Sequence, residues 1–90
     1  MPVTVKIPSQ LRAATGNQAE LVAEGSTVGE VLDTVFAEHG DLRERITEEG
    51  ELRRFVNVYV GGEDIRYGEG LGTAVSDGSE ITILPAVAGG

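Results

Sequence analysis

The chain ends in a narrow, uncharged segment whose terminal group can take part in chemistry once it is activated. None of the last five residues carries a charge or a side-chain hydrogen-bonding group, and none is larger than valine: Ala86, Val87, Ala88, Gly89 and Gly90. Glycine has no Cβ, so the backbone at Gly89 and Gly90 fits a tight passage. The α-carboxylate of Gly90 is ionised at neutral pH and stays unreactive until something activates it. We therefore predict that Gly90 is the reactive residue and that Pro85 to Gly89 thread a partner's active site.

Chance is a weak explanation for the two terminal glycines. At an average glycine usage of about 7%, a Gly-Gly ending arises in roughly 0.5% of chains, and in roughly 2% at the glycine content of this chain. Because an extended residue spans about 3.3 Å, the segment from Pro85 to Gly90 reaches roughly 20 Å from the body of the protein. The predicted organisation is a rigid domain over residues 1–85 and a flexible tail over residues 86–90.

Size, charge and composition argue against several other classes of protein. Ninety residues form one domain that is too small to enclose a deep pocket, so we do not expect a self-contained enzyme. Fifteen acidic residues against seven basic ones give a net charge of −8, which repels nucleic acids and anionic membranes and favours a protein partner with a basic face. Cysteine is absent, which excludes disulfides, thiolate catalysis and thiolate metal sites.

The sequence offers neither a membrane segment nor a metal site. It has no amino-terminal apolar signal and no long apolar run, so we expect a cytoplasmic protein. The acidic run of Glu48, Glu49 and Glu51 could bind a cation only if its side chains were held in a fixed arrangement, and the sequence shows nothing that would hold them. A solvated loop is therefore the expected structure. His39, the sole histidine, is expected at a helix end rather than in catalysis.

Apolar residues at every second position predict four strands, over residues 3–7, 19–24, 55–60 and 81–84. The first two strands form a hairpin with a long loop. Gly61 and Gly62 supply the positive φ angles of a two-residue turn, after which Ile65 belongs to a short returning strand.

One long helix is predicted after the second strand. Thr27, three residues before Glu30, is a capping-box pattern, and His39 with Gly40 closes the helix. One face of this helix carries the apolar residues Val28, Val31, Leu32, Val35 and Phe36. A further turn or two of helix is expected around Leu42 and Ile46, which are four residues apart.

Two segments are predicted to lack regular strands. Residues 47–54 are polar, so we expect a loop and the most mobile internal segment. The glycine-rich segment 68–75 is expected to form one tight helical turn at Leu71, Ala74 and Val75. A phosphate cradle is disfavoured there, because the segment lacks the lysine and the helix start that such loops use and contains Glu69.

These elements predict an α+β domain, a mixed sheet with one main helix packed across one face. The helix-facing set comprises Val3, Val5, Ile7, Val56, Val58, Val60, Ile81 and Ile83. Alternation then sends Phe55, Tyr59 and Leu84 to the open face, where they would form a docking patch beside the tail. The alternative is that Phe55 and Tyr59 fill a secondary cluster under the polar loop.

Three segments resemble a known family. The hairpin FVNVYVGGEDIR (55–66), the segment GLGTAVSDG (70–78) and the ending ITILPAVAGG (81–90) are similar to the ubiquitin-like MoaD/ThiS sulfur carriers, and most of all to members associated with cysteine biosynthesis. The resemblance covers nearly the whole chain. It implies a ubiquitin-like β-grasp fold, which agrees with the pattern of strands and helix above.

The same resemblance implies a role as a protein cosubstrate. A ubiquitin-activating-like adenylyltransferase/sulfurtransferase would adenylate the carboxylate of Gly90 with ATP and magnesium, and a sulfur donor would displace AMP to leave a thiocarboxylate. This chain would bind no cofactor and would not be an enzyme. Tyr59, Phe55 and Leu84 would touch the adenylating partner.

The destination of the sulfur stays open at this point. The resemblance favours delivery to a pyridoxal-phosphate cysteine synthase, followed by release of cysteine from the tail by a JAMM-type zinc peptidase. Other members of the family supply molybdopterin, the thiazole of thiamine or thiosugars.

Two other classes of function compete with a carrier. The first is a ubiquitin-like modifier joined through its terminal glycine to target lysines, for which the single lysine, Lys6, leaves few points for self-chains. The second is an interaction domain with an inert end. Glu63, Asp64 and Glu69 would complement a basic partner surface in any of these.

Overall fold

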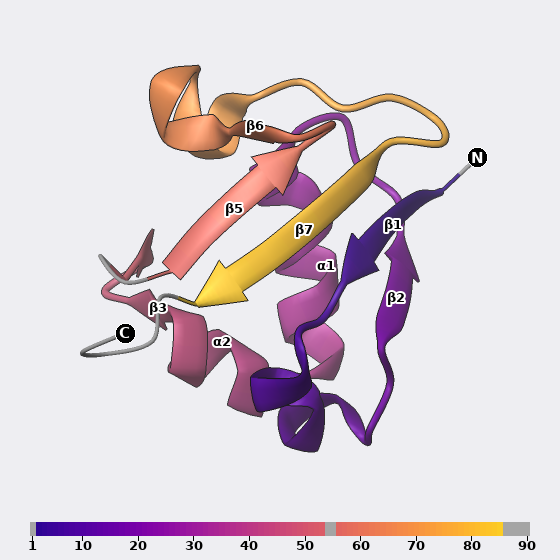
Figure 1. Cartoon of the computed structure of the whole chain (residues 1–90), viewed down its shortest axis with the longest axis vertical. Helices are drawn as coiled ribbons and strands as arrows, with labels where there is room; N and C mark the ends of the chain where they lie inside the picture. Colours follow the sequence, from indigo (N-terminus) through magenta and orange to yellow (C-terminus); the bar gives the residue numbers. More distant parts are fainter. Residues whose placement is uncertain (1, 54–55, 86–90) are drawn as a thin grey trace.

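The computed structural model describes residues 2–53 and 56–85 and contains one mixed five-stranded sheet. Across the sheet the strands are β2 (Glu20–Ala23), β1 (Val3–Lys6), β7 (Glu80–Pro85), β5 (Val56–Val60) and β6 (Glu63–Asp64). β1 and β7 run parallel, and the other neighbours are antiparallel. The last strand therefore lies in the middle of the sheet, between β1 and β5 (Figure 1).

The main helix, α1 (Val28–Glu38), covers one face of this sheet (Figure 1). Its start confirms the predicted capping pattern, since the Glu30 backbone N–H donates to the Thr27 hydroxyl at 3.2 Å and the Glu30 carboxylate accepts from the Ser26 backbone N–H at 3.0 Å. His39 ends the helix, as predicted, and its backbone N–H donates to the Val35 carbonyl at 2.9 Å. A second helix, α2 (Gly40–Ile46), follows at once and confirms the expected short extension.

The core lies between the sheet and α1. Its fully buried members, none more than 2% exposed, are Val3, Val5, Ile7, Val28, Val31, Leu32, Val35, Leu42, Ile46, Val56, Val58, Ile81 and Ile83. This confirms the predicted helix-facing set except for Val60, which is partly buried and packs against the core's edge. Alternation along each strand therefore assigns its two faces as the sequence predicted.

The prediction of a loop over residues 47–54 was wrong. β3 (Thr47–Glu48) and β4 (Glu51–Leu52) form a small antiparallel hairpin. Its turn uses Glu49 and Gly50, whose φ angles of 52° and 83° are those of a tight two-residue turn. Strands of two residues are too short to show alternation, which is why the pattern was missed.

Short 3₁₀ helices account for the remaining differences. The long loop of the first hairpin contains η1 (Ser9–Thr15). Ile65, predicted in a returning strand, instead begins η2 (Ile65–Tyr67), because β6 stops after two residues and Asp64 caps the turn by accepting from the Arg66 backbone N–H at 2.8 Å. The helical turn predicted at Leu71, Ala74 and Val75 is confirmed only at Leu71, which lies in η3 (Gly70–Gly72). Ala74 instead forms a β-bridge with Thr27, and Val75 lies outside any helix. None of the helices in the described part of the chain is long and apolar enough to cross a membrane.

Candidate functional site

The root of the predicted reactive tail is the end of the central strand. β7 reaches Pro85, which is paired with Val56 at the start of β5. Gly90 and the threading residues Ala86, Val87, Ala88 and Gly89 lie outside the described residues. What the structure defines is therefore the platform from which the tail begins, at the side of the sheet where the β3–β4 hairpin lies (Figure 1).

The sheet face opposite α1 is the candidate docking face. Tyr59 and Leu84 both belong to it, because their neighbours along each strand, such as Val58 and Ile83, are buried against the helix. Tyr59 is opposite Thr82, so Leu84 is its diagonal neighbour, a position roughly 7–8 Å away across an antiparallel ladder.

The apolar side chains on this face differ in their exposure. Leu84 is 45% exposed, whereas Tyr59 is only partly buried. Phe55, the third predicted member of the docking patch, lies outside the described residues. The sequence reasoning missed Val22, which is 62% exposed and opposite Thr4 on the same face. An apolar residue at the outward position of an alternating strand was the signal that would have found it.

Arg66 is a second residue that sequence reasoning missed. Its guanidinium donates to the carbonyl of Val56 at 2.7 Å, to the carbonyl of Arg53 at 3.0 Å and to the side-chain oxygen of Asn57 at 3.1 Å. Asn57 is opposite Leu84 in the ladder between β5 and β7. The guanidinium therefore links Arg53, Val56 and Asn57 by hydrogen bonds, beside the end of β7.

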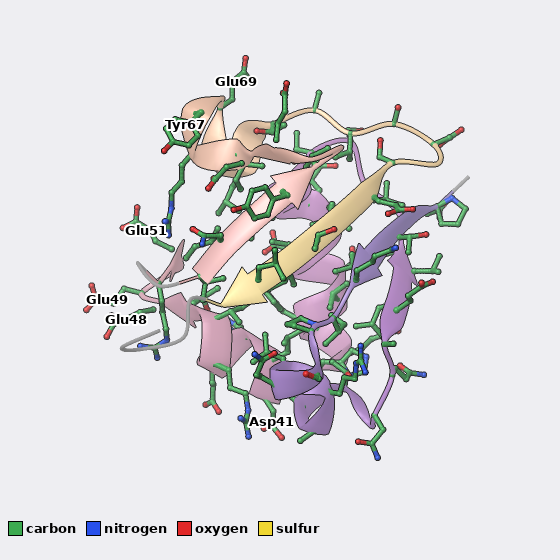
Figure 2. The ribbon with its side chains drawn as sticks, in the orientation of Figure 1. Asp41, Glu48, Glu49, Glu51, Tyr67 and Glu69 are labelled. Atoms are coloured by element: carbon green, nitrogen blue, oxygen red, sulfur yellow. The ribbon has the colours of Figure 1, made fainter. Side chains whose placement is uncertain are left out.

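The charged side chains around this face are mostly acidic. Lys6 on β1 pairs with Glu80 on β7 at 3.4 Å, and both side chains are about half exposed. Glu48, Glu49 and Glu51 gather on the β3–β4 hairpin (Figure 2). A surface bordered in this way favours a partner with basic residues.

The described residues hold no group of three or more histidine or acidic side chains arranged to bind a metal ion. An apolar hollow of about 400 Å³ lies beside α1 rather than on the open face. Its apolar lining includes Leu32, Phe36, Leu52 and Leu71. Phe36, which was predicted on the apolar face of the helix, is partly buried and packs against the core.

Comparison with known proteins identifies the family. The model of the ThiS family matches residues 5–90. The chain belongs to the ThiS family. The sulfur carrier protein CysO of Mycobacterium tuberculosis is 48% identical over 93 residues that span all of both chains. The ThiS family consists of small carriers that are not themselves enzymes, which confirms the prediction that this member is not an enzyme.

Solved structures of ThiS-family proteins and their relatives confirm the predicted ubiquitin-like β-grasp fold. The structure of the BexX/CysO complex of Amycolatopsis orientalis contains a chain that matches with a TM-score of 0.91 and 49% identity, over 98% of this chain and 99% of that one. The small archaeal modifier protein SAMP1 of Haloferax volcanii matches with a TM-score of 0.85 and 29% identity over the full length of both chains. Proteins named as sulfur carriers and as modifiers thus share this fold.

Proposed function

We propose that this protein is a sulfur carrier that works through a thiocarboxylate on Gly90. In the presence of magnesium, a partner joins a carboxylate oxygen of Gly90 to the α-phosphate of ATP, and the bond between the α- and β-phosphates breaks to release pyrophosphate. The acyl group then carries AMP, which is a good leaving group. A sulfur donor then attacks the acyl carbon, the acyl–oxygen bond to AMP breaks, and a thiocarboxylate remains. The protein contributes the tail and the docking face, and the partner contributes the nucleotide site and the catalytic groups.

The observation that carries this proposal is the end-to-end similarity to a protein named as a sulfur carrier. CysO of Mycobacterium tuberculosis aligns with the whole chain, including the segment that ends in Gly89 and Gly90. The platform supports it as well, because β7 pairs with β1 over residues 80–82 and with β5 over residues 81–85, which fixes the position of its last residue, Pro85. A fixed platform lets an extended tail reach one defined point in a partner.

For the destination of the sulfur we propose cysteine biosynthesis. The acceptor would be a pyridoxal-phosphate cysteine synthase, and a JAMM-type zinc peptidase would release the product from the tail. What supports this choice is the similarity to proteins named CysO. Because the activating step uses ATP, we expect it to take place in the cytoplasm.

The test is a measurement of intact mass. The protein is incubated with a ubiquitin-activating-like adenylyltransferase from the same organism, ATP, magnesium and sulfide. A carrier gains the mass difference between one sulfur and one oxygen atom, and the gain disappears when ATP is left out. An unchanged mass contradicts the proposal, provided that the same preparation of the adenylyltransferase loads another carrier protein.

A second candidate function is that of a protein modifier. The similarity to SAMP1, and to small archaeal modifier protein 3 of Haloferax volcanii with 39% identity over 69 residues, favours it. Both functions begin with adenylation of the terminal glycine. Adducts between this protein and lysines of other proteins, found by mass spectrometry of digested cell extract, would support the modifier. A thiocarboxylate without such adducts supports the carrier.

A further inference from the structure

Among the described residues, the edge of β5 that faces β6 has no strand neighbour at Val56, and the Arg66 side chain takes that place. In the hairpin closed by Gly61 and Gly62, Val60 and Glu63 form the last pair of the ladder, so the backbone groups of Val60 point toward β6. The backbone N–H and C=O groups of a strand point to opposite edges at successive residues and to the same edge at every second residue. Those of Val56, four residues before Val60, therefore also point to the edge that faces β6. β6 ends at Asp64, opposite Tyr59, and does not reach as far as Val56.

The hydrogen bonds of Val56 agree with this geometry. Its N–H donates to the Arg53 carbonyl at 3.0 Å, and its carbonyl accepts from the Arg66 guanidinium at 2.7 Å. Neither group is directed at β7. Arg66 therefore satisfies, with a side chain, a carbonyl that a longer β6 would have satisfied with backbone.

The same guanidinium fixes the orientation of the Asn57 amide. Guanidinium groups only donate, so the atom of Asn57 at 3.1 Å from Arg66 must be the oxygen Oδ1. Asn57 alternates with the buried residues Val56 and Val58, which places its side chain on the open face. Its Nδ2 group has no acceptor among the described residues and is left as a donor opposite Leu84.

We propose that Arg66 is a positioning residue for sulfur loading, which holds the Asn57 amide as a hydrogen-bond donor toward the activating partner. The inference rests on the proposed function, and it names a polar anchor within the docking face. The acceptor in the partner is a backbone carbonyl or a carboxylate oxygen, since Nδ2 only donates. Arg66 also keeps the first residues of β5 in register with Leu84 and Pro85, from which the tail begins.

The test compares steady-state sulfur loading of variants at varied carrier concentration, with the adenylyltransferase, ATP and sulfide. Arg66→Gln is expected to raise KM for the carrier about tenfold and to leave kcat within about twofold, because a docking contact is lost while the tail is intact. Arg66→Lys keeps the charge but cannot donate to three acceptors from a planar fork, so we expect at most partial recovery. Arg12→Gln is the matched control, since Arg12 also donates to a backbone carbonyl, that of Ile7, at 3.2 Å. Its KM should equal that of the parent.

Asn57→Asp separates docking from stability. Aspartate still accepts from Arg66 but has no donor in place of Nδ2, so the variant should fold normally and show the same rise in KM. If Arg66→Gln does not fold, the KM of Asn57→Asp decides whether the Asn57 donor contributes to docking. In NMR spectra, the side-chain NH₂ signals of Asn57 should shift in Arg66→Gln and stay in place in Arg12→Gln.

The outcomes distinguish the two proposals. A parent protein that is never loaded contradicts the proposed function. If the parent is loaded and both Arg66→Gln and Asn57→Asp have the KM of the parent, Arg66 has no positioning role. The proposed carrier function is then unaffected.

Discussion

The two faces of the sheet have opposite compositions although the same strands build them. In β7, Ile81 and Ile83 are fully buried under α1, whereas their neighbour Leu84 is 45% exposed on the other side. In β5, Val56 and Val58 are buried, while Asn57 and Tyr59 remain in reach of solvent. Folding free energy therefore comes mainly from the helix-covered face, and recognition is left to the open one. Neighbouring residues of one strand can test this separation.

The largest effect is expected at the carboxy-terminal glycine, Gly90. Deleting Gly90, or adding one residue after it, moves the carboxylate by one residue length and should lower sulfur loading at least about 100-fold. Unfolding in urea should show a change below about 0.5 kcal/mol, as for a surface change. Loading at the parental rate in either variant would contradict the assignment of Gly90.

On the helix-covered face, Ile83→Ala should cost about 2–5 kcal/mol of unfolding free energy, because it leaves a cavity in the core. Ile83 is 0% exposed. The measurement is the urea midpoint, and the KM for loading, corrected for the folded fraction, should stay within about twofold of the parent's. A large rise in KM with normal stability would mean that the two faces are not separate.

The adjacent change Leu84→Ala is the matched counterpart on the open face. It should cost less than about 1 kcal/mol of stability, since Leu84 is already 45% exposed. The KM for the activating partner should rise about fivefold, which corresponds to roughly 1 kcal/mol of lost docking free energy. If Leu84→Ala instead destabilises the fold as much as Ile83→Ala, the docking face is mainly structural.

The smallest effect is expected for Lys6→Gln, which removes the ion pair with Glu80 on the open face. Pairs between exposed side chains contribute about 0–1 kcal/mol, so we expect a change near 0.5 kcal/mol or less, and less still at high salt. Glu80→Gln should give the same value in urea unfolding. A loss of several kcal/mol in either variant would show that this face also supports the fold.

Two hairpins show how far the sequence predicts the fold. The turn at Gly61 and Gly62 was predicted, because the strand before it alternates over five residues. The turn at Glu49 and Gly50 was missed, since its strands have two residues each and one left-handed position is a glutamate. Local pattern identifies elements that are long enough to repeat, and only tertiary contacts determine the shorter ones.

The candidate site divides in the same way. The reactivity of the tail was predicted from its residue types together with the family resemblance, and alternation assigned Tyr59 and Leu84 to one face. Arg66 could not be found in this manner, because the carbonyls it binds belong to residues ten and thirteen positions earlier. A side chain that replaces a missing strand neighbour leaves no periodic trace in the sequence.

The central position of β7 also bears on mechanical load. A partner that pulls the tail draws β7 along its own axis, and β1 and β5 resist on both sides because the hydrogen bonds of both ladders must slide together. A last strand at an edge would instead peel away one bond at a time. A pull on the carboxy-terminal end of the domain therefore loads both ladders at once.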